Sequence, residues 1–380
     1  MKHADRLQHV NEYYFSEKLR EIQSLVEQGK PIINLGIGNP DLPPPPQAIE
    51  AMHQALDDVS KHGYQTYKGI VTLRNAISAF YAKHYAVNLD PHSEILPLFG
   101  AKEGIMHLSM AYLNPGDAVL VPNPGYASYS AIAQLLETHM IHYDLTPENN
   151  WYPDFEQLEK MDLSTIKMMW VNYPNMPTGA KATTLLFEKL IAFGKKHDIL
   201  IVNDNPYSFI LTEKPRSILQ VDGAKEVAVE LNSLSKSFNM AGWRVGMLVG
   251  NQEIISNALK VKSNMDSGML YGLQMGASVA LEINSDWFEQ QNQTYSKRRS
   301  IVWKIADKLG FTYDKNAEGF FVWMQLPNGI QSYDMADKLL YEHDIFVTPG
   351  SIFGSNGNHY VRFSLCINEE KLEEVLRRLG

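Results

Sequence analysis

The segment SLSKSFNMAGWRVG (residues 233–246) places one lysine, Lys236, between two serines among mostly small and apolar residues. It directly follows an apolar run at residues 227–231. Burying an ammonium group without a partner costs free energy, and a lysine in such a place often has a lowered pKa. Its neutral amine is then a good nucleophile towards a carbonyl carbon, with which it forms a Schiff base. Lys236 is therefore the strongest candidate nucleophile of the chain.

The motifs of several other chemistries are missing from the sequence. Gly36-Ile37-Gly38 begins like a dinucleotide fingerprint, but Asn39-Pro40 follows where a helix should open. No lysine-bearing phosphate loop and no GxSxG elbow occurs. The 12 histidines show no metal-binding spacing such as HExxH, and the single cysteine cannot build a thiolate zinc site. We therefore expect no metal, and pyridoxal phosphate as the cofactor, because it is the commonest one that needs a lysine.

Pyridoxal phosphate makes further demands, and the sequence has a candidate for each. Its phosphate needs backbone N–H groups at a helix start, and residues 99–103 (FGAKE) form a small-residue turn that runs into a helix. Its ring needs a carboxylate at the nitrogen and an aromatic neighbour, for which Asp204 and Tyr126 are available. A substrate carboxylate needs an arginine, either Arg244 or Arg362. Taken singly, each residue also has a structural explanation, such as a helix cap, a core aromatic or an ion pair.

The elements around these residues have the pattern of a parallel α/β sheet. Short, apolar, β-rich runs recur through the middle of the chain, at residues 118–121, 166–171, 199–202, 227–231 and 245–249. Amphipathic stretches such as 183–197 lie between them. This alternation predicts a mainly parallel sheet with helices on both faces. Ligands bind at the carboxyl ends of the strands in such sheets, and Tyr126, Asp204 and Lys236 follow strands.

The pattern changes after about residue 284. A long charged helix follows, then the alternating segments FFVWMQL and YVRFSLC, then a closing helix with Asn368 as its N-cap. We predict a large α/β domain at residues 46–284 and a smaller α+β domain formed by residues 1–45 and 285–380. The N-terminal arm should pack with the smaller domain. The prolines at 43–46 should form a stiff, extended connector.

Composition and charge restrict the class of protein. A chain of 380 residues with 44% hydrophobic and 20% charged residues is typical of a soluble globular protein with a large core. The net charge of −9 argues against nucleic-acid and anionic membrane partners. One cysteine, Cys366, gives no disulfide framework and favours a reducing compartment. The first residues mix charges and contain no apolar signal-peptide core, so we expect a cytoplasmic protein.

Eight segments of the chain resemble, in order and spacing, the class I/II aminotransferases, the fold-type I pyridoxal-phosphate enzymes related to aspartate aminotransferase. They are LGIGNPD (35–41), YQTYKGIVTLR (64–74), FGAKEG (99–104), PNPGYASY (122–129), NYPNMPTGA (172–180), NDNPY (203–207), SLSKSFNMAGWRVG (233–246) and VRFSL (361–365). The match covers nearly the whole chain. It implies a mainly parallel sheet of the seven-stranded type in the large domain. It also implies an aminotransferase that moves an amino group from an L-amino acid to a 2-oxo acid by ping-pong chemistry.

The resemblance further implies a role for each matched residue around the ring. Lys236 would hold the cofactor as an imine and then move the proton between the substrate Cα and the C4′ carbon. Asp204 would pair with the pyridinium nitrogen, and Tyr207 would hydrogen-bond the ring O3′. Tyr126 would stack on the ring. In this arrangement Lys236 is not a buried charge, because it is tied up as an imine.

The remaining matched residues would bind the phosphate and the substrate. The groups around the phosphate would be the N–H groups of Ala101 and Lys102, and the side chains of Ser233, Ser235 and Arg244. Tyr64 would reach the phosphate of the neighbouring subunit, which implies a homodimer with shared active sites. Arg362, with the backbone N–H of Gly38, would take the α-carboxylate of the substrate.

The sequence departs from the family pattern at two positions. Before Pro177 the family usually has an asparagine that donates to O3′, and this chain has Met176. Pro206 stands where a branched apolar residue is common. Asn172 or Asn175 could supply the missing donor. The departures concern the tuning of the cofactor and leave the enzyme class unchanged.

Two other functions stay open at this level. One is a different reaction on the same fold, such as C–S β-elimination, racemisation or decarboxylation. The other is a non-catalytic regulator, against which the intact lysine and the missing helix-turn-helix region argue. The stretch 262–269 has no arginine for a second substrate carboxylate, and Tyr13, Tyr14 and Phe15 lie near the N-terminal arm. We therefore expect neutral or bulky amino acids as substrates.

Overall fold

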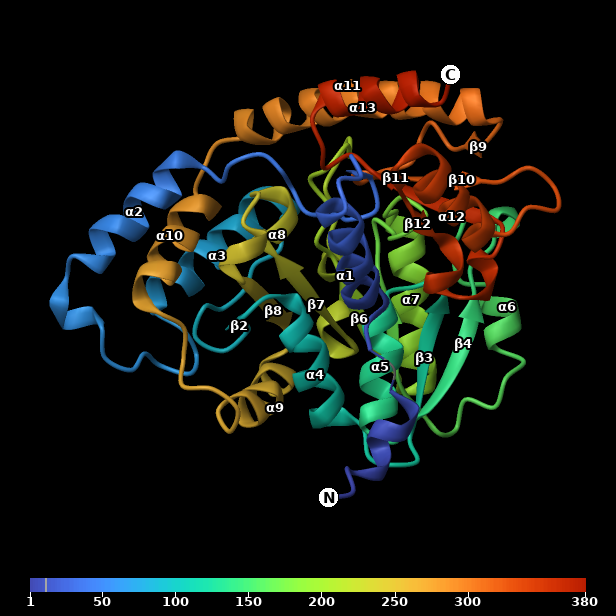
Figure 1. Cartoon of the computed structure of the whole chain (residues 1–380). Coiled ribbons are helices and arrows are strands. Elements are labelled where there is room, and N and C mark those ends of the chain that lie inside the picture. The colour runs from blue at the N-terminus through green and yellow to red at the C-terminus, as the bar shows by residue number, and fades with distance from the viewer. Residues whose placement is uncertain (11) are drawn as a thin grey trace.

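The computed structural model describes residues 1–10 and 12–380. In this part of the chain the central feature is a seven-stranded sheet (Figure 1). From one edge to the other its strands are β2 (Ile95–Leu98), β8 (Gly246–Gly250), β7 (Ala228–Ser233), β6 (Leu200–Asp204), β5 (Ile166–Val171), β3 (Ala118–Asn123) and β4 (His139–Asp144). Strand β8 runs antiparallel to both of its neighbours, and the other pairs are parallel. The predicted α/β fold with a mainly parallel sheet is confirmed.

The five predicted strands correspond to β3, β5, β6, β7 and β8, with ends that differ by at most two residues. Strands β2 and β4 were not expected, for two different reasons. β4 has the sequence HMIHYD and lies at the sheet edge with half of its residues exposed, so it carries no apolar run. β2 has only four residues and includes Pro97. Short and edge strands give a weak sequence signal.

Helices cover both faces of the sheet, and their apolar stripes form two buried clusters. On one face pack α2 (Pro46–Leu56), α3 (Val71–Tyr85), α7 (Thr184–His197) and α10 (Tyr271–Leu281). On the other pack α4 (Ala101–Tyr112), α5 (Ala127–Leu135) and α9 (Gln252–Lys262). Two short helices, α6 (Phe155–Leu158) and α8 (Leu234–Ser237), lie in connections. The predicted helix at 183–197 is α7, whose N-cap Thr183 accepts a hydrogen bond from the Leu186 N–H at 3.1 Å.

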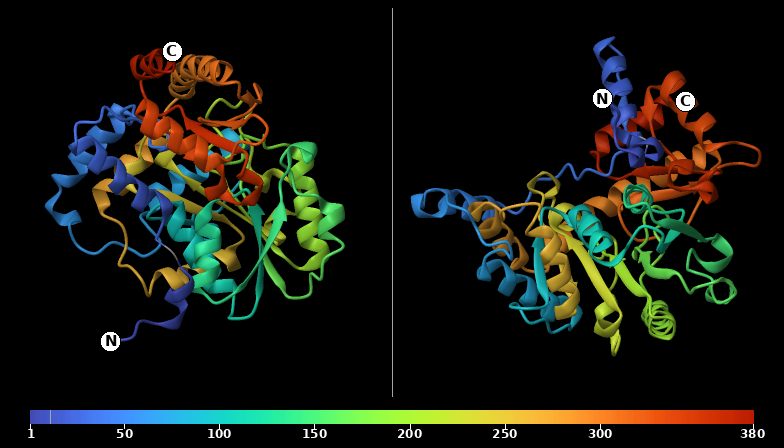
Figure 2. Two further views of the ribbon diagram at one scale, coloured as in Figure 1. Left: turned by 45° about the vertical axis from the view of Figure 1, so that its right-hand side comes forward. Right: turned by 90° about the horizontal axis from the view of Figure 1, so that it is seen from below.

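A second group of elements is formed by the two ends of the chain. Its strands are β1 (Ile33–Asn34), β9 (Thr312–Tyr313), β10 (Phe321–Gln325), β11 (Ile345–Phe346), β12 (Thr348–Pro349) and β13 (Tyr360–Ser364). Its helices are α1 (Tyr14–Glu27), α11 (Asp286–Leu309), α12 (Ser332–His343) and α13 (Glu369–Arg378). Strands β12, β13, β10 and β9 form an antiparallel sheet, and β1 pairs with β11 in parallel. Helices α11 and α13 lie side by side (Figures 1 and 2).

The predicted division at residues 46 and 284 stays our proposal. It is supported by a further buried cluster, which includes Ile33 and Leu35 together with residues from 295 onward and, among its described buried residues, reaches the predicted large domain only through Met176, Tyr207 and Ile210. The proline run is not extended throughout, because Pro46 is the first residue of α2, a position where a missing N–H costs nothing. The N-terminal arm contacts both groups: residues 5–9 lie beside α5, whereas α1 packs against α12 and β11. Among the described helices, none has the length and apolarity needed to cross a bilayer.

Candidate active site

A cavity of about 360 Å³ lies at the carboxyl ends of strands β3, β6 and β7. Tyr126 follows β3, Asp204 is the last residue of β6, and Lys236 lies in the helical turn after β7, and all three line the cavity. The cavity is closed by the start of α4, by α1, and by strands β10 and β13. The predicted site residues that line it are Gly38, Ala101, Lys102, Tyr126, Asp204, Tyr207, Ser233, Ser235, Lys236, Arg244 and Arg362. Residues that are far apart in the sequence thus meet in one place.

Lys236 lies in the short helix α8 and points across the cavity. Its Nζ donates a hydrogen bond to the Gly38 carbonyl at 2.7 Å and lies 5.8 Å from the centroid of the Phe320 ring. Burial lowers the pKa of Lys236 to about 8, and the cations of Arg362 and Arg244 contribute in the same direction. At this pKa roughly a tenth of the amine is neutral at pH 7. Lys236 is therefore both held in place and nucleophilic.

Asp204 ends strand β6 and is buried, with 7% of its surface exposed. Its Oδ2 accepts a hydrogen bond from the Tyr129 hydroxyl at 2.9 Å, whereas its Oδ1 has no partner among the described residues. Burial raises the pKa of Asp204 to about 6, against the lowering effects of Tyr129 and Lys236. A buried carboxylate oxygen without a partner is costly. This oxygen is suited to a ligand that brings a donor N–H.

The start of α4 forms the floor of an anion site. Gly100 precedes it with φ +85°, and a Cβ there would lie 2.3 Å from Nη2 of Arg244. Only glycine therefore lets the guanidinium approach the helix N-terminus, where backbone N–H groups and the helix dipole favour an anion. Glu103 fixes this turn, because it accepts a hydrogen bond from the Phe99 N–H and pairs with the buried Lys262 at 3.2 Å.

Two buried hydroxyls face the same anion site. Ser233 caps α8, and its Oγ accepts a hydrogen bond from the Ser235 N–H at 3.1 Å. Ser233 Oγ donates to Ser235 Oγ at 2.9 Å, which leaves the Ser235 proton available for a third group. Arg244 donates to the Ala241 carbonyl at 3.1 Å and keeps its other N–H groups available. The set matches what a phosphate needs: backbone N–H groups, hydroxyls and a guanidinium.

Arg362 lies in β13 and is buried, with 4% of its surface exposed. Its Nη2 donates to the Gly36 carbonyl at 2.8 Å, and its Nη1 lies 3.2 Å from the sulfur of Met176. The guanidinium stacks at 3.8 Å from the Phe321 ring centroid and 4.7 Å from that of Phe353. Burial lowers the pKa of Arg362 to about 10, so it stays charged at neutral pH. A thioether is a weak acceptor, which a carboxylate would readily displace.

The two aromatic residues predicted around the ring lie in the cavity wall. Tyr126 is the N-cap of α5, and its ring meets that of Tyr129 edge-on, with centroids 5.6 Å apart. Tyr207 is buried against Phe320 and Phe321, at centroid distances of 5.5 and 6.0 Å, and burial raises its pKa. Tyr207 is fully packed, and Tyr126 is partly buried in the cavity wall. They can therefore donate hydrogen bonds or offer a ring face.

The asparagines next to Met176 are already engaged in the loop. Asn172 donates through its Nδ2 to the Asp204 carbonyl and accepts from the Met176 N–H at 2.7 Å. Asn175 donates to the Asn172 carbonyl at 3.1 Å and accepts from the Thr178 hydroxyl at 2.7 Å. Each Nδ2 therefore has one N–H group engaged in the loop and a second N–H group, and Asn172 lines the cavity. Tyr64, in contrast, lies outside the cavity and is 93% exposed.

Sequence reasoning missed Tyr129, which holds Asp204. Its ring is fully buried and stacks on Trp170, with centroids 4.9 Å apart and planes within 5°. Because Tyr126 is the N-cap of α5, a residue three positions later lies about one turn further along that helix. That spacing was the available signal, and it points a second phenol towards the end of β6.

These residues fit pyridoxal phosphate when they are tested one group at a time. Asp204 Oδ1 is a buried acceptor for a protonated ring nitrogen. The turn at Gly100, with Ser233, Ser235 and Arg244, is a cradle for a phosphate that a Cβ at position 100 would fill. Lys236 presents its amine between them.

Comparisons with known proteins agree with the geometry. Residues 30–379 match the family model described as aminotransferase class I and II. The chain is 39% identical to an LL-diaminopimelate aminotransferase of Aquifex aeolicus, over 99% of this chain and 98% of that protein. It superposes on the substrate-bound structure of BacF from Bacillus subtilis with a TM-score of 0.96 at 37% identity, over 100% and 97% of the two chains. An aromatic aminotransferase from Pyrococcus horikoshii gives a TM-score of 0.87 at 30% identity, over 94% and 97%.

A family match of this length and identity decides both the fold and the general reaction. Enzymes of this family act on amino acids and 2-oxo acids and are generally dependent on pyridoxal phosphate. The chain therefore belongs to the class I and II aminotransferases, and it is an aminotransferase.

Proposed function

We propose that this aminotransferase binds pyridoxal 5′-phosphate on Lys236, with Asp204 at the ring nitrogen. The observation that carries the proposal is the unpartnered Oδ1 of Asp204, buried in the same cavity as a lysine whose pKa is lowered to about 8. When bound, the cofactor withdraws electrons from the substrate Cα and so makes its proton acidic. The amine of Lys236 would accept that proton at Cα and return it to the cofactor carbon. Tyr207 would hydrogen-bond the ring O3′, and Tyr126 would cover the ring.

The phosphate would be bound at the start of α4, where Ala101 and Lys102 provide N–H groups, with Ser233, Ser235 and Arg244 around it. The α-carboxylate of the substrate would be bound by Arg362 and the Gly38 N–H. Arg362 is held by the Gly36 carbonyl and by two aromatic rings, which orient the guanidinium plane before the substrate arrives. Orientation of this kind lowers the entropic cost of catalysis.

For the substrate side chain we propose a bulky apolar or aromatic group. The cavity wall near Arg362 is lined by Tyr13, Phe15, Ile37, Phe321 and Phe353. Such a wall favours apolar area and offers a second substrate carboxylate no arginine.

A dibasic substrate with a distal carboxylate is the second candidate, because relatives at 36–39% identity are named LL-diaminopimelate aminotransferases. Lys102 lines the cavity with its Nζ 4.9 Å from the Tyr13 ring centroid, where it could meet a distal carboxylate.

A donor panel tests the proposal. The purified, cofactor-loaded protein is mixed with L-phenylalanine, L-leucine, L-aspartate or LL-diaminopimelate without an oxo acid, and the pyridoxamine form and the released oxo acid are measured. We expect one oxo acid per site, with the highest kcat/KM for an aromatic or bulky donor. A higher kcat/KM for LL-diaminopimelate would favour the second candidate, and for aspartate would refute the apolar assignment. Formation of ammonia or carbon dioxide instead would indicate elimination or decarboxylation.

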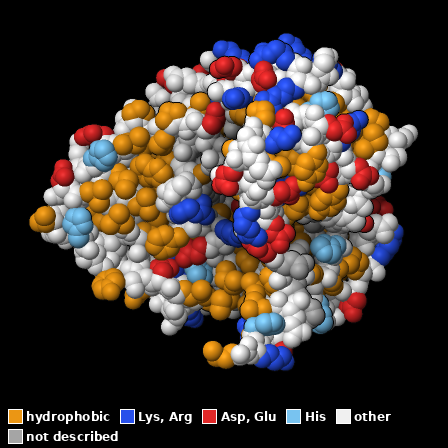
Figure 3. All heavy atoms as spheres, viewed as in Figure 1, with side chains coloured by type: hydrophobic (Ala, Val, Ile, Leu, Met, Phe, Trp, Pro, Cys, Tyr) orange, Lys and Arg blue, Asp and Glu red, His pale blue; other side chains and the backbone are white. Residues whose placement is uncertain are grey.

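We also propose a homodimer with shared active sites, in which Tyr64 reaches the partner's phosphate. Figure 3 shows apolar side chains gathered over the side of the molecule where α2 and α10 lie in Figure 1. The chain segments beside these helices expose Val59, Tyr64 and Leu270. Light scattering should give twice the chain mass. Mixing inactive Tyr64→Ala and Lys236→Ala proteins should restore activity in hybrid dimers if the sites are shared, and should not if they are separate.

A further inference from the structure

Gly38 lies in the segment 35–41. The first residues of this segment, Leu35 and Gly36, are bound to the second group of elements. The Leu35 carbonyl accepts a hydrogen bond from the Ser364 N–H at 2.7 Å. The Gly36 carbonyl accepts from Thr348 Oγ1 and from Arg362 Nη2, both at 2.8 Å. A Cβ at Gly36 would lie 2.4 Å from the Phe346 ring, so the backbone is pressed against β11. Residues 35–38 and Arg362 thus form one unit.

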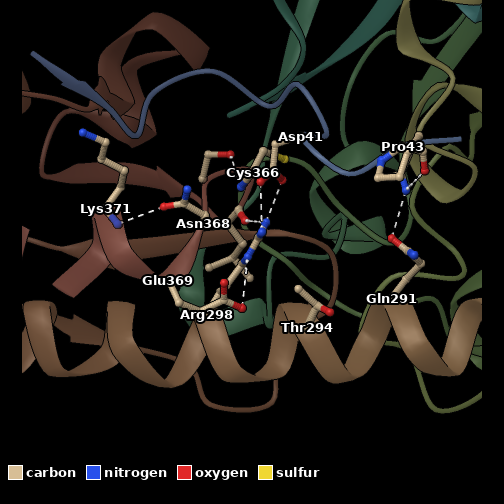
Figure 4. A network of polar contacts seen from close by, with 12 residues as sticks. Asp41, Pro43, Gln291, Thr294, Arg298, Cys366, Asn368, Glu369 and Lys371 are labelled. Atoms are coloured by element: carbon tan, nitrogen blue, oxygen red, sulfur yellow. Dashed lines mark hydrogen bonds and ion pairs between the residues drawn. The ribbon is translucent and has the colours of Figure 1, made fainter. Parts of the chain in front are cut away.

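Asp41 ends this segment in a clamp made by Arg298 of α11 (Figure 4). Nη1 of Arg298 lies 2.6 Å from Oδ1 of Asp41, and Nη2 lies 2.9 Å from Oδ2. Nη1 also donates to the Leu365 carbonyl at 3.0 Å, and Nε lies 3.5 Å from a carboxylate oxygen of Glu369. The Arg298 side chain is only 2% exposed. A two-pronged pair fixes the orientation of its partner as well as neutralising its charge.

Two residues after Asp41, the chain is hydrogen-bonded to the group of elements around the seven-stranded sheet. The Pro43 carbonyl accepts a hydrogen bond at 3.1 Å from Nδ2 of Asn239, which follows Lys236 by three residues (Figure 4). The same Nδ2 donates to Gln291 of α11 at 2.9 Å. The chain therefore passes from one group of elements to the other between Asp41 and Pro43. Asp41 is therefore the last residue of this segment whose side chain is held by the second group of elements.

We propose that Arg298 is a positioning residue for the substrate carboxylate. Its clamp on Asp41 sets the path of residues 38–41, and so places the Gly38 N–H relative to Arg362. The same path places the Gly38 carbonyl, on which the Lys236 amine rests at 2.7 Å. This inference rests on the carboxylate site proposed above.

The neighbouring arginine provides a matched control. Arg299 lies next to Arg298 on α11, donates to the Ala317 carbonyl at 2.9 Å and stacks on Trp303 at 5.0 Å. Neither contact involves residues 35–43. Replacing Arg299 by lysine changes the same helix in the same way without touching the segment that carries Gly38.

The test compares Arg298→Lys and Asp41→Asn with Arg299→Lys in cofactor-loaded protein. We expect KM to rise about tenfold or more for two donors with different side chains and for the oxo acid alike, because all share the α-carboxylate. We expect kcat to fall less than about threefold, with an unchanged cofactor spectrum. Asp41→Asn keeps the volume of the side chain and serves if Arg298→Lys does not fold.

Arg362→Lys separates the two proposals. If it raises KM while Arg298→Lys and Asp41→Asn behave like the Arg299→Lys control, or lose only kcat and melting temperature, Arg298 has a structural role alone and the inference is wrong. If Arg362→Lys leaves KM unchanged, the proposed carboxylate site and this inference both fail.

Discussion

The two halves of the active site are built in different ways. The half that would bind the cofactor takes Ser233, Ser235, Lys236 and Arg244 from one stretch of twelve residues at the end of β7. The half that would bind the substrate carboxylate takes Gly38 and Arg362 from two distant segments. Local backbone geometry positions the four residues at the end of β7, whereas Ala101, Tyr126 and Asp204 join them from other segments. The second half depends on long-range contacts, among them the bond of Arg362 to Gly36.

Burial shifts the pKa of a residue in each half, upward in one half and downward in the other. Asp204 is a buried acid whose pKa is raised to about 6, and Arg362 is a buried base whose pKa is lowered to about 10. In each case desolvation disfavours the charged form, and an opposite charge brought by a ligand would offset that cost. Ligand charge should therefore stabilise both halves. A substitution that abolishes binding in one half should leave ligand binding in the other half measurable.

The largest effect is expected from Lys236→Ala. The variant should still bind the cofactor noncovalently through Asp204 and the anion site, because these lie on other side chains. It should lose the imine absorbance and turn over at a negligible rate. Absorbance spectra and a transamination assay measure both properties. Near-normal transamination by this variant would remove Lys236 from its role.

Arg362→Lys should weaken the half that would bind the substrate carboxylate. An ammonium cannot make the two-pronged contact, so kcat/KM should fall roughly a hundredfold, which corresponds to about 3 kcal/mol, for every amino acid alike. Cofactor affinity should stay within about twofold of the wild type. A loss confined to one class of substrate would mean that Arg362 reads the side chain instead.

Tyr129→Phe should weaken the cofactor half more mildly. Its hydroxyl lowers the pKa of Asp204, so its removal raises that pKa further above the usual value of 3.8. Only the carboxylate can pair with a protonated ring nitrogen, and cofactor affinity of the wild type should therefore fall as the pH drops through about 6. In Tyr129→Phe the midpoint should move to higher pH, with affinity at pH 7 reduced up to about tenfold. Fluorescence titration of cofactor-free protein against pH measures the midpoint, and an unshifted one would contradict this role of Tyr129.

The smallest effect concerns Met176, which lies between the halves. Its thioether gives O3′ no donor, and Asn172 and Asn175 are engaged in the loop. O3′ should therefore stay more basic and hold the imine proton more tightly. We expect Met176→Asn to lower the pKa of that imine. A spectrophotometric pH titration of both proteins decides this. Equal midpoints would mean that another group already donates, and a rise would show that the sign is wrong.

The sequence was most informative where chemistry and local structure coincide. We could recognise the strand ends at Asp204 and before Lys236, and the turn at Gly100. Each of these features depends on residues that are neighbours in the sequence. The path of residues 35–43 could not, because it is set by Arg298 and Arg362 from the far end of the chain. Tyr129 was missed because a buried tyrosine in an apolar helix is usually a core residue.

The most direct test of the central claim is to locate the cofactor on the chain. Cofactor-loaded protein is reduced with borohydride, digested and mapped by mass spectrometry, with Lys236→Ala as the control. The proposal predicts a single reduced adduct on the peptide that contains Lys236, and none in the variant. An adduct on another lysine, such as Lys102 or Lys262, with Lys236 unmodified would contradict it.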